Sequence, residues 1–159
     1  MLRIAQLYAL VGLDLSARGF PSGQPLRDAG HVALLGRFQA RLGTGLRWRT
    51  EVPIASASID GPRDFRAWDA VVGGAGWEIG IEAETHVRDL QALERRLALK
   101  QGDGAMSVVI LVLGDTRHHR ELMSGAGIAL RSAFPTTARS ALRSLGRAES
   151  PASNAVVLV

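Results

Sequence analysis

Residues 66–99 constrain the fold most, because they combine two alternating segments, a glycine-rich turn and a long amphipathic segment. In residues 77–84, apolar side chains alternate with glutamate or glycine, which is the two-residue period of a strand with one apolar face. Residues 67–72 show a similar alternation. Residues 73–76 (Gly-Gly-Ala-Gly) lie between the two segments and can supply the positive φ angles that a hairpin needs. We therefore predict an antiparallel hairpin followed by a helix.

The carboxylates inside this predicted hairpin need an explanation, because acidic residues are poor strand formers and are costly to bury without a partner. If the loop comprises the four residues 73–76, Asp69 faces Gly80 and Glu82 is its diagonal neighbour. In this register Asp69, Glu82 and Glu84 point to the same face of the hairpin. The opposite, apolar face is then led by Trp68, Trp77 and Ile79.

Carboxylates gathered on one face suit a hard divalent cation, since Mg²⁺ takes oxygen ligands and keeps several of its waters. Glycine opposite Asp69 would also leave room for a metal ion or a phosphate. We therefore treat Asp69 and Glu82 as candidate metal ligands and assign Glu78, near a strand end, to the solvated surface. The residues leave open a second interpretation, in which this is an ordinary solvated sheet face with surface acids.

The rest of the chain predicts helices and strands around this hairpin. Residues 107–113 form a continuous apolar, β-branched run, typical of a central strand buried on both faces. Residues 87–101 carry apolar side chains at helical spacing, and we expect this helix to begin at Thr85 or His86 and to end at Gly102. The other expected elements are helices at 2–11, 31–42, 117–123 and from Thr136 or Thr137 to 145, strands at 13–17, 46–54 and 155–159, and loops at 19–30 and 55–63.

The charge balance is compatible with an anionic partner. The 159-residue chain has a net charge of +4, and Lys100 is its only lysine. Arginine presents planar, bidentate donors that match phosphate, although GC-rich coding would also explain the preference for arginine. Nucleic acid is therefore an expected partner. The absence of cysteine excludes disulfides and thiolate metal sites.

The sequence also indicates where the protein acts. No apolar run is long enough to span a bilayer, so we expect no membrane association. The first residues are interrupted by Asp14 and lack a small-residue cleavage site, so we expect no signal peptide and a cytoplasmic protein. The sequence leaves a homodimer open.

From His31 onwards the expected elements follow the order helix, strand, strand, strand, helix, strand, helix. Asp69 lies on the second of these strands, and Glu82-Ala83-Glu84 lies on the third. In this order and in these acids, residues 31–115 resemble the restriction-endonuclease-like superfamily, the PD-(D/E)xK nucleases. The resemblance implies an α/β fold with a mixed central β-sheet flanked by helices. It also implies a Mg²⁺- or Mn²⁺-dependent endonuclease with Asp69, Glu82 and Glu84 as catalytic residues.

The chain departs from the family pattern at two positions. Trp68 stands where the pattern has proline, and Glu84 stands where it has the lysine that orients or activates the attacking water. Some members with glutamate at that position remain active, whereas others that lost motif residues became binding or structural domains. Gln91 and the nearby Arg95, Arg96 and Lys100 resemble helix residues that support the site in some branches and could contact a phosphate.

A second resemblance covers residues 10–42, 46–54 and 66–72. They are similar to the C-terminal domain of actinobacterial proteins that carry a helix-turn-helix domain first and whose C-terminal domain has an unknown or nuclease-like function. We therefore expect residues 1–30 to be the remnant of a linker, with a helix, a short strand and a loop, and residues 31–159 to be the nuclease-like domain. The resemblance adds a helix-turn-helix domain or another protein as an expected partner.

Three functional hypotheses follow from the sequence. The first is a metal-dependent nuclease, and the second is a catalytically inactive module of the same fold that binds DNA or a protein within a transcriptional regulator or a toxin–antitoxin-like system. Arg47 and Arg49 could contact phosphates in that second case. The third, a zinc site of His86, His118 and His119, is disfavoured because adjacent histidines on a helix point in different directions.

Overall fold

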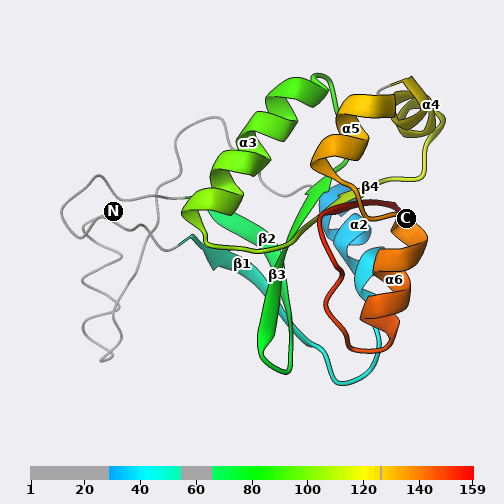
Figure 1. The fold of residues 1–159 in the computed structure, drawn as a ribbon. Coiled ribbons are helices and arrows are strands. Elements are labelled where there is room, and N and C mark those ends of the chain that lie inside the picture. Colours follow the sequence, from blue (N-terminus) through cyan, green and yellow to red (C-terminus); the bar gives the residue numbers. More distant parts are fainter. Residues whose placement is uncertain (1–28, 55–65, 126) are drawn as a thin grey trace, which may run out of the picture.

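The computed structural model describes residues 29–54, 66–125 and 127–159. The elements expected before residue 29, the loop expected at 55–63, and nearly all of the predicted linker at 1–30 lie outside the described residues. Within them the chain forms an α/β fold around a five-stranded mixed sheet (Figure 1). Among the described helices, none has the length and apolar character needed to cross a membrane.

The order of helices and strands from residue 29 onwards agrees with the predicted one, and the segment around 128–134, which the sequence left ambiguous, is helical. The elements are α2 (Ala29–Gln39), β1 (Arg47–Pro53), β2 (Ala67–Gly74), β3 (Trp77–Glu84), α3 (Leu90–Asp103), β4 (Val109–Leu113), α4 (Arg117–Gly125), α5 (Gly127–Ala133), α6 (Ala138–Gly146) and β5 (Ala155–Leu158).

The strands lie in the sheet in the same order as in the chain, β1-β2-β3-β4-β5. The first three are antiparallel neighbours. β4 runs parallel to β3, and β5 runs parallel to β4. A parallel neighbour requires a crossover, which α3 supplies between β3 and β4, and which α4, α5 and α6 supply between β4 and β5. Figure 1 shows the helices distributed over the two faces of the sheet.

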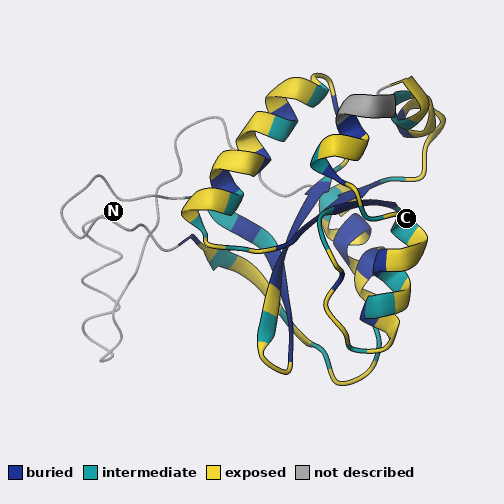
Figure 2. Cartoon of the chain, viewed as in Figure 1, coloured by how far each residue is buried: buried dark blue, intermediate teal, exposed yellow. Residues whose placement is uncertain are grey.

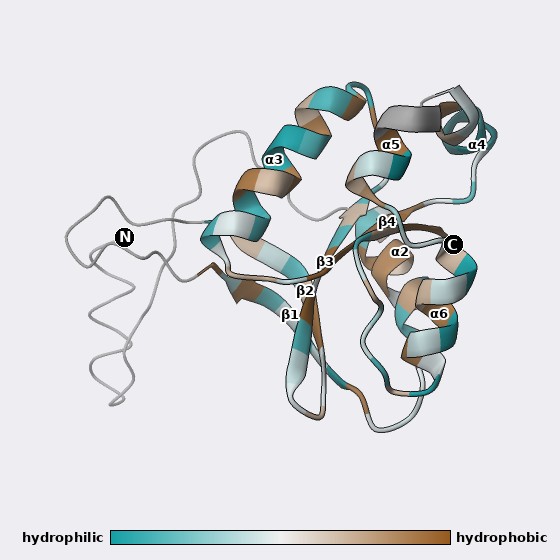
Figure 3. Cartoon of the chain, in the orientation of Figure 1, coloured by the Kyte–Doolittle hydropathy of each residue, from teal (hydrophilic) through white to brown (hydrophobic). Residues whose placement is uncertain are grey.

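One face of the sheet is covered by α2 and α6. Phe38 of α2 and Leu145 of α6 are fully buried against alternate residues of the strands, such as Ile79 of β3 and Val112 of β4. The other face is covered by α3 and α5, where Leu97 packs with the intervening strand residues. Because β4 is buried on both faces, all five of its residues are apolar, as its continuous β-branched run predicted. Figures 2 and 3 show this buried, apolar centre and the polar outer surfaces of the helices.

The start of α3 differs from the prediction. The helix begins at Leu90 instead of near Thr85, because Asp89 is its N-cap: its side chain accepts a hydrogen bond of 2.9 Å from the backbone N–H of Ala92. Val87 is buried ahead of the helix, which explains its apolar character without helical backbone. The helix also continues past the predicted end at Gly102.

Candidate functional site

The acidic hairpin has a tighter turn than predicted. Gly74 lies opposite Trp77, so the turn contains only residues 75–76, and the expected four-residue loop 73–76 is wrong. The physical reason is a close contact: a Cβ at Gly74 would lie 2.3 Å from the Trp77 indole ring, so glycine lets the aromatic ring cover the strand end. The pairing is therefore shifted by two residues relative to the predicted register.

This shift brings Asp69 and Glu82 closer than expected. The β2–β3 ladder ends at the pair Ala70–Ile81, and one step further Asp69 comes opposite Glu82. There the strands separate, and the two side chains replace the ladder hydrogen bonds. The Asp69 carboxylate accepts a 2.8 Å bond from the N–H of Ala83, and the Glu82 carboxylate accepts a 3.3 Å bond from the N–H of Asp69. Two carboxylates therefore occupy the gap between the strands.

The sequence predicted that Asp69 shares one face of the hairpin with Glu82 and Glu84. In the structure, the side chain of Asp69 points to the other face. Its Oδ2 lies 3.4 Å from Nε2 of His31 on α2, whereas Glu82 contacts Lys100 on α3. Since α2 and α3 cover opposite faces, the acidic pair connects the two faces through the gap in the sheet. His31 was not a predicted site residue, and no periodicity or spacing in the sequence singles it out.

An irregularity in β2 accounts for the direction of Asp69. Trp68 and Val71 both pack in the cluster with Val109, although residues three apart on a regular strand point to opposite faces. Glu51, across from this point on β1, has a positive φ of 53°. The prediction that Trp68 lies on the same face as Trp77 is therefore wrong.

The space expected above Gly80 is filled by the Trp68 ring. A Cβ at Gly80 would lie 2.7 Å from an atom of that indole. Gly80 lies opposite Val71 and not opposite Asp69. Gly80 therefore allows the Trp68 ring to pack closely against the strand. The prediction that this position leaves room for a metal ion or a phosphate is wrong.

Lys100 is more deeply buried than any arginine of the described residues, and it lies against the acidic pair. Its side chain is 9% exposed, and Nζ forms an ion pair with Oε1 of Glu82. The ammonium also lies 5.0 Å from the centre of the Trp68 ring, at a distance that permits a cation–π contact. The helix α3 thus provides a lysine beside Glu82, although the strand position two residues after Glu82 holds Glu84.

The two carboxyl groups have pKa values shifted in opposite directions. Burial by itself would raise the pKa of Asp69, but the hydrogen bond and charge of His31, the N–H of Ala83 and the charge of Lys100 lower it below the ordinary value. Burial and the negative charge of Asp69 raise the pKa of Glu82 to about 7, although Lys100 acts against them. The pair thus has a stable anion beside a carboxyl group that ionises near neutral pH.

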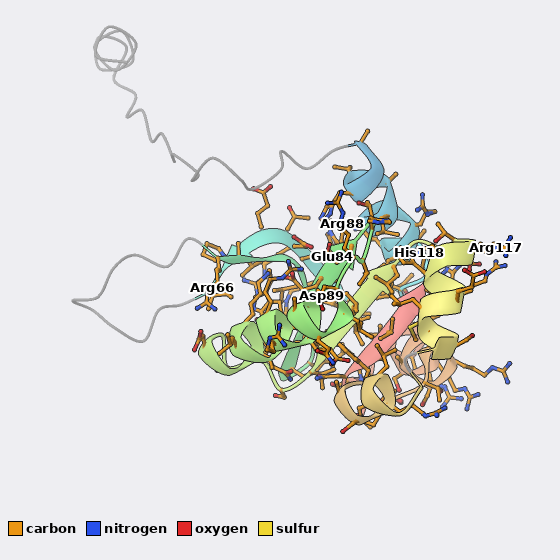
Figure 4. The ribbon with its side chains drawn as sticks, turned by 90° about the horizontal axis from the view of Figure 1, so that it is seen from above. Arg66, Glu84, Arg88, Asp89, Arg117 and His118 are labelled. Carbon is orange, nitrogen blue, oxygen red and sulfur yellow. The ribbon has the colours of Figure 1, made fainter. Side chains whose placement is uncertain are left out.

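The third predicted acid lies at the edge of an open hollow. Glu84 forms an ion pair with Arg96 of α3 and is half-buried. A hollow of about 350 Å³ is lined by both residues and by His86, Arg88 and Asp89. In Figure 4, which views the molecule from above, Glu84, Arg88 and Asp89 lie near one another at the centre, and Arg66 and Arg117 lie toward opposite sides.

The helix residues that were predicted to support the site separate into two pairs. Arg96 and Lys100 are four residues apart, share one side of α3 and contact Glu84 and Glu82. Gln91 and Arg95, also four apart, are exposed and contact none of the three acids. On β1, Arg49 forms an ion pair of 2.7 Å with Glu78, and Arg47 donates a hydrogen bond to the carbonyl of Gly74.

The three histidines of the disfavoured zinc hypothesis lie near one another. The rings of His86 and His118 stack with centroids 4.9 Å apart and an interplanar angle of 19°. Nε2 of His118 lies 3.0 Å from the carbonyl of Val87, while His119 is buried with Nδ1 2.8 Å from the carbonyl of Gly114. The lone pairs of the ring nitrogens lie in the planes of the rings. Because the rings of His86 and His118 are stacked and nearly parallel, their lone pairs do not point toward a common metal ion.

Asp69 and Glu82 offer carboxylate oxygens, which are the type of ligand that Mg²⁺ takes. Within the described residues, no three acidic or histidine side chains gather closely enough to enclose a metal. Mg²⁺ nevertheless binds through one or two carboxylates and keeps most of its waters. Burial and the charge of Asp69 raise the pKa of Glu82, and a cation bound beside the pair would favour its ionised form. Comparison of the chain with protein-family models, with curated proteins and with solved structures finds no match.

Proposed function

We propose that the chain is a metal-dependent phosphodiesterase of the nuclease type, with Asp69 and Glu82 as the ligands of Mg²⁺ or Mn²⁺. One observation carries the proposal: both carboxylates occupy the gap between β2 and β3, and a buried lysine lies against one of them. The element order and the mixed sheet are compatible with a restriction-endonuclease-like core, which remains part of the proposal.

The bound metal ion, His31 and Lys100 would have separate roles in this reaction. When bound, the divalent cation would polarise the phosphate and lower the pKa of a bound water. His31 orients Asp69, and its contact favours the ionised carboxylate that a metal requires. Lys100 holds Glu82 and supplies positive charge close to where a phosphate oxygen would be stabilised.

Lys100 also supplies what the strand motif lacks. The resemblance expects a lysine two residues after Glu82, where the chain has Glu84. The ammonium of Lys100 reaches the same carboxylate from α3. The substitution at position 84 therefore does not deprive the site of a lysine, and Glu84 is free to interact with Arg96 or to position a water.

Calorimetric titration of Mn²⁺ tests the proposal. We expect binding by the wild-type chain and a loss of at least about tenfold in affinity in Asp69→Asn and Glu82→Gln, because each removes a charged oxygen ligand. Glu78→Gln is the matched control, since Glu78 lies on the same strand but pairs with Arg49 near the turn. Cleavage of a mixture of DNA and RNA by the wild type, lost in the two site variants, would complete the test. Unchanged metal binding in both site variants would refute the assignment.

A second candidate function is a non-catalytic module that binds nucleic acid or a protein. It is favoured by the fact that each carboxylate already has a basic neighbour, His31 for Asp69 and Lys100 for Glu82, with which a metal ion would compete. This candidate predicts no heat of Mn²⁺ binding to the wild type. It also predicts that binding of any nucleic acid survives Glu82→Gln.

A further inference from the structure

The segment of α5 and α6 carries an unusual concentration of uncompensated positive charge. Residues 127–148 contain four arginines and no acidic residue. The four are exposed, and none forms a salt bridge with the part of the chain that the structure describes. By contrast, five other arginines each pair with an acid: Arg49, Arg66, Arg96, Arg117 and Arg120.

Three of these arginines form a row: Arg139 and Arg143 lie on α6, and Arg147 is its C-cap residue. Arg139, Arg143 and Arg147 follow one another at intervals of four residues, so each is turned only about 40° from the last around a helix of 3.6 residues per turn. The buried residues Ala141 and Leu145 lie on the opposite side of the helix. The row therefore points away from the sheet, in keeping with the exposed outer side of α6 in Figure 2.

The helix that carries this row is fixed at both ends. Its N-cap Thr137 accepts a hydrogen bond of 3.2 Å from the N–H of Ser140. At the other end, the N–H of Gly43 donates to the carbonyl of Leu145, and a Cβ at Gly43 would lie 2.6 Å from the carbonyl oxygen of Gly146. The arginines are thus presented on a rigid support, which lowers the entropic cost of binding a partner.

Such a row favours a partner with regularly spaced negative charges. Like charges four residues apart on a helix repel one another, and here no acidic side chain compensates them. Successive arginines are about 6 Å apart along the helix axis, which is comparable to the spacing of phosphates along one nucleic-acid strand. The guanidinium group also matches phosphate oxygens with two parallel hydrogen bonds.

We propose that Arg139, Arg143 and Arg147 form a docking surface for the phosphate backbone of a nucleic acid. The proposal rests on the proposed function for the identity of the polyanion. The surface is nevertheless distinct from the acidic pair: α6 packs on the same face as α2, whereas Lys100 and Arg96 approach the acids from α3 on the other face. The surface holds a strand by charge and carries no sequence preference.

The test measures binding in metal-free buffer, so that it does not depend on catalysis. Fluorescence anisotropy of a short DNA duplex, and of a single-stranded RNA of the same length, is recorded at several salt concentrations. The variant Arg139→Ala/Arg143→Ala/Arg147→Ala is compared with the control Arg66→Ala/Arg117→Ala/Arg120→Ala, which removes the same charge from arginines that are ion-paired. We expect the α6 variant to lose about 2–3 units of the slope of log K against log salt on the duplex, and the control to lose less than one unit.

Each other outcome decides against the surface. Equal losses in the two variants would show a non-specific effect of net charge, and no wild-type binding to either probe would refute the docking surface. Binding of anionic lipid vesicles that the α6 variant loses, while nucleic-acid binding is unchanged, would also refute it.

Cleavage assays separate the two proposals. Salt-dependent binding through α6 without cleavage would support the docking surface and refute the acidic site. Cleavage with an unchanged salt slope in the α6 variant would support the acidic site and refute the docking surface.

Discussion

Lys100 lies with its ammonium group against the carboxylate of Glu82 and with its aliphatic stem buried. A buried ion pair is weak evidence for stability, because the cost of removing both charges from water offsets their attraction. What the pair does provide is a positive charge that keeps Glu82 from being fully protonated at neutral pH. The contact therefore affects the ionisation of Glu82 more than the stability of the fold.

The variant Lys100→Met tests this interpretation, since methionine keeps the apolar stem and removes the charge. Without the ammonium, the pKa of Glu82 in the folded state rises further, so Glu82 stays protonated to higher pH. The unfolded chain ionises this group at its ordinary pKa, so the folded state of the variant is less stable at high pH. We expect the free energy of unfolding, measured in urea, to fall by roughly 1–3 kcal/mol at pH 8 and by much less at pH 5. The double variant with Glu82→Gln should recover most of the loss. An equal loss at both pH values would indicate a packing defect instead.

Gly80 illustrates how a single glycine fits a large side chain. Its substitution by alanine would place Cβ 2.7 Å from the Trp68 ring, so we expect Gly80→Ala to destabilise the fold by about 1–3 kcal/mol. Gly36 is the matched control, because it lies in the middle of α2 with open space around its Cβ position. Gly36→Ala should leave stability unchanged or raise it by up to about 1 kcal/mol. Thermal unfolding of the two variants distinguishes a local clash from a general effect of replacing glycine.

At the scale of elements, the local patterns were sufficient for most of the fold. The alternation in residues 77–84 predicted β3 with its observed bounds, the β-branched run predicted β4, and Thr137 caps α6 as expected. These signals are local, because strand period, strand propensity and capping depend on residues that are neighbours in the chain. The two-residue shift of the hairpin escaped prediction because it depends on how the Trp77 ring covers Gly74.

The residues of the candidate site were predicted only where they follow from local sequence. Asp69 and Glu82 were selected because carboxylates inside strands are unusual, and the structure brings them directly together. His31 and the burial of Lys100 could not be found in this way, since each contact joins an element to a strand that is distant in the chain. The break in the alternation of β2 at Asp69 likewise lies across from an irregularity on another strand, the positive φ of Glu51.

The start of α3 provides a test at this scale. Asp89→Ala removes the side-chain oxygen that accepts the N–H of Ala92, so we expect a loss of about 1 kcal/mol in the free energy of unfolding. Thr85→Ala, at a position outside the helix, should have little effect, whereas it would be the harmful variant if the helix began where the sequence predicted. Urea unfolding of the two variants compares the two starts directly.

At the scale of the whole molecule, the sheet separates two kinds of charge. The acidic pair lies in the gap between β2 and β3, where α2 and α3 approach it from opposite faces with His31 and Lys100. The unpaired arginines of α6 lie on the outer surface of the α2 face. A strand held on α6 would have to pass around α2 to reach the acids, so the two proposals together require a substrate longer than a few nucleotides.

The pH dependence of stability gives the most general test of the acidic pair. Burial and Asp69 raise the pKa of Glu82 from 4.5 to about 7, so between these values the folded chain binds a proton that the unfolded chain has released. The contribution of Glu82 to the free energy of unfolding is therefore largest below about pH 4.5. It is lost as the pH rises to about 7. The lowered pKa of Asp69 acts only at lower pH, where its contribution disappears as the carboxylate is protonated.

We expect the metal-free wild type to lose on the order of 1–3 kcal/mol of unfolding free energy between pH 4.5 and 7, and Glu82→Gln to lose correspondingly less. A saturating concentration of Mn²⁺ should reverse the trend in the wild type, raising Tm more at pH 8 than at pH 5.5, because the metal requires the ionised carboxylate. Calorimetric melting of both proteins at the two pH values, with and without Mn²⁺, measures each effect. Equal pH dependence in the two proteins would mean that Glu82 ionises normally. A pH effect without a Mn²⁺ effect would establish the buried pair and refute its role as a metal site.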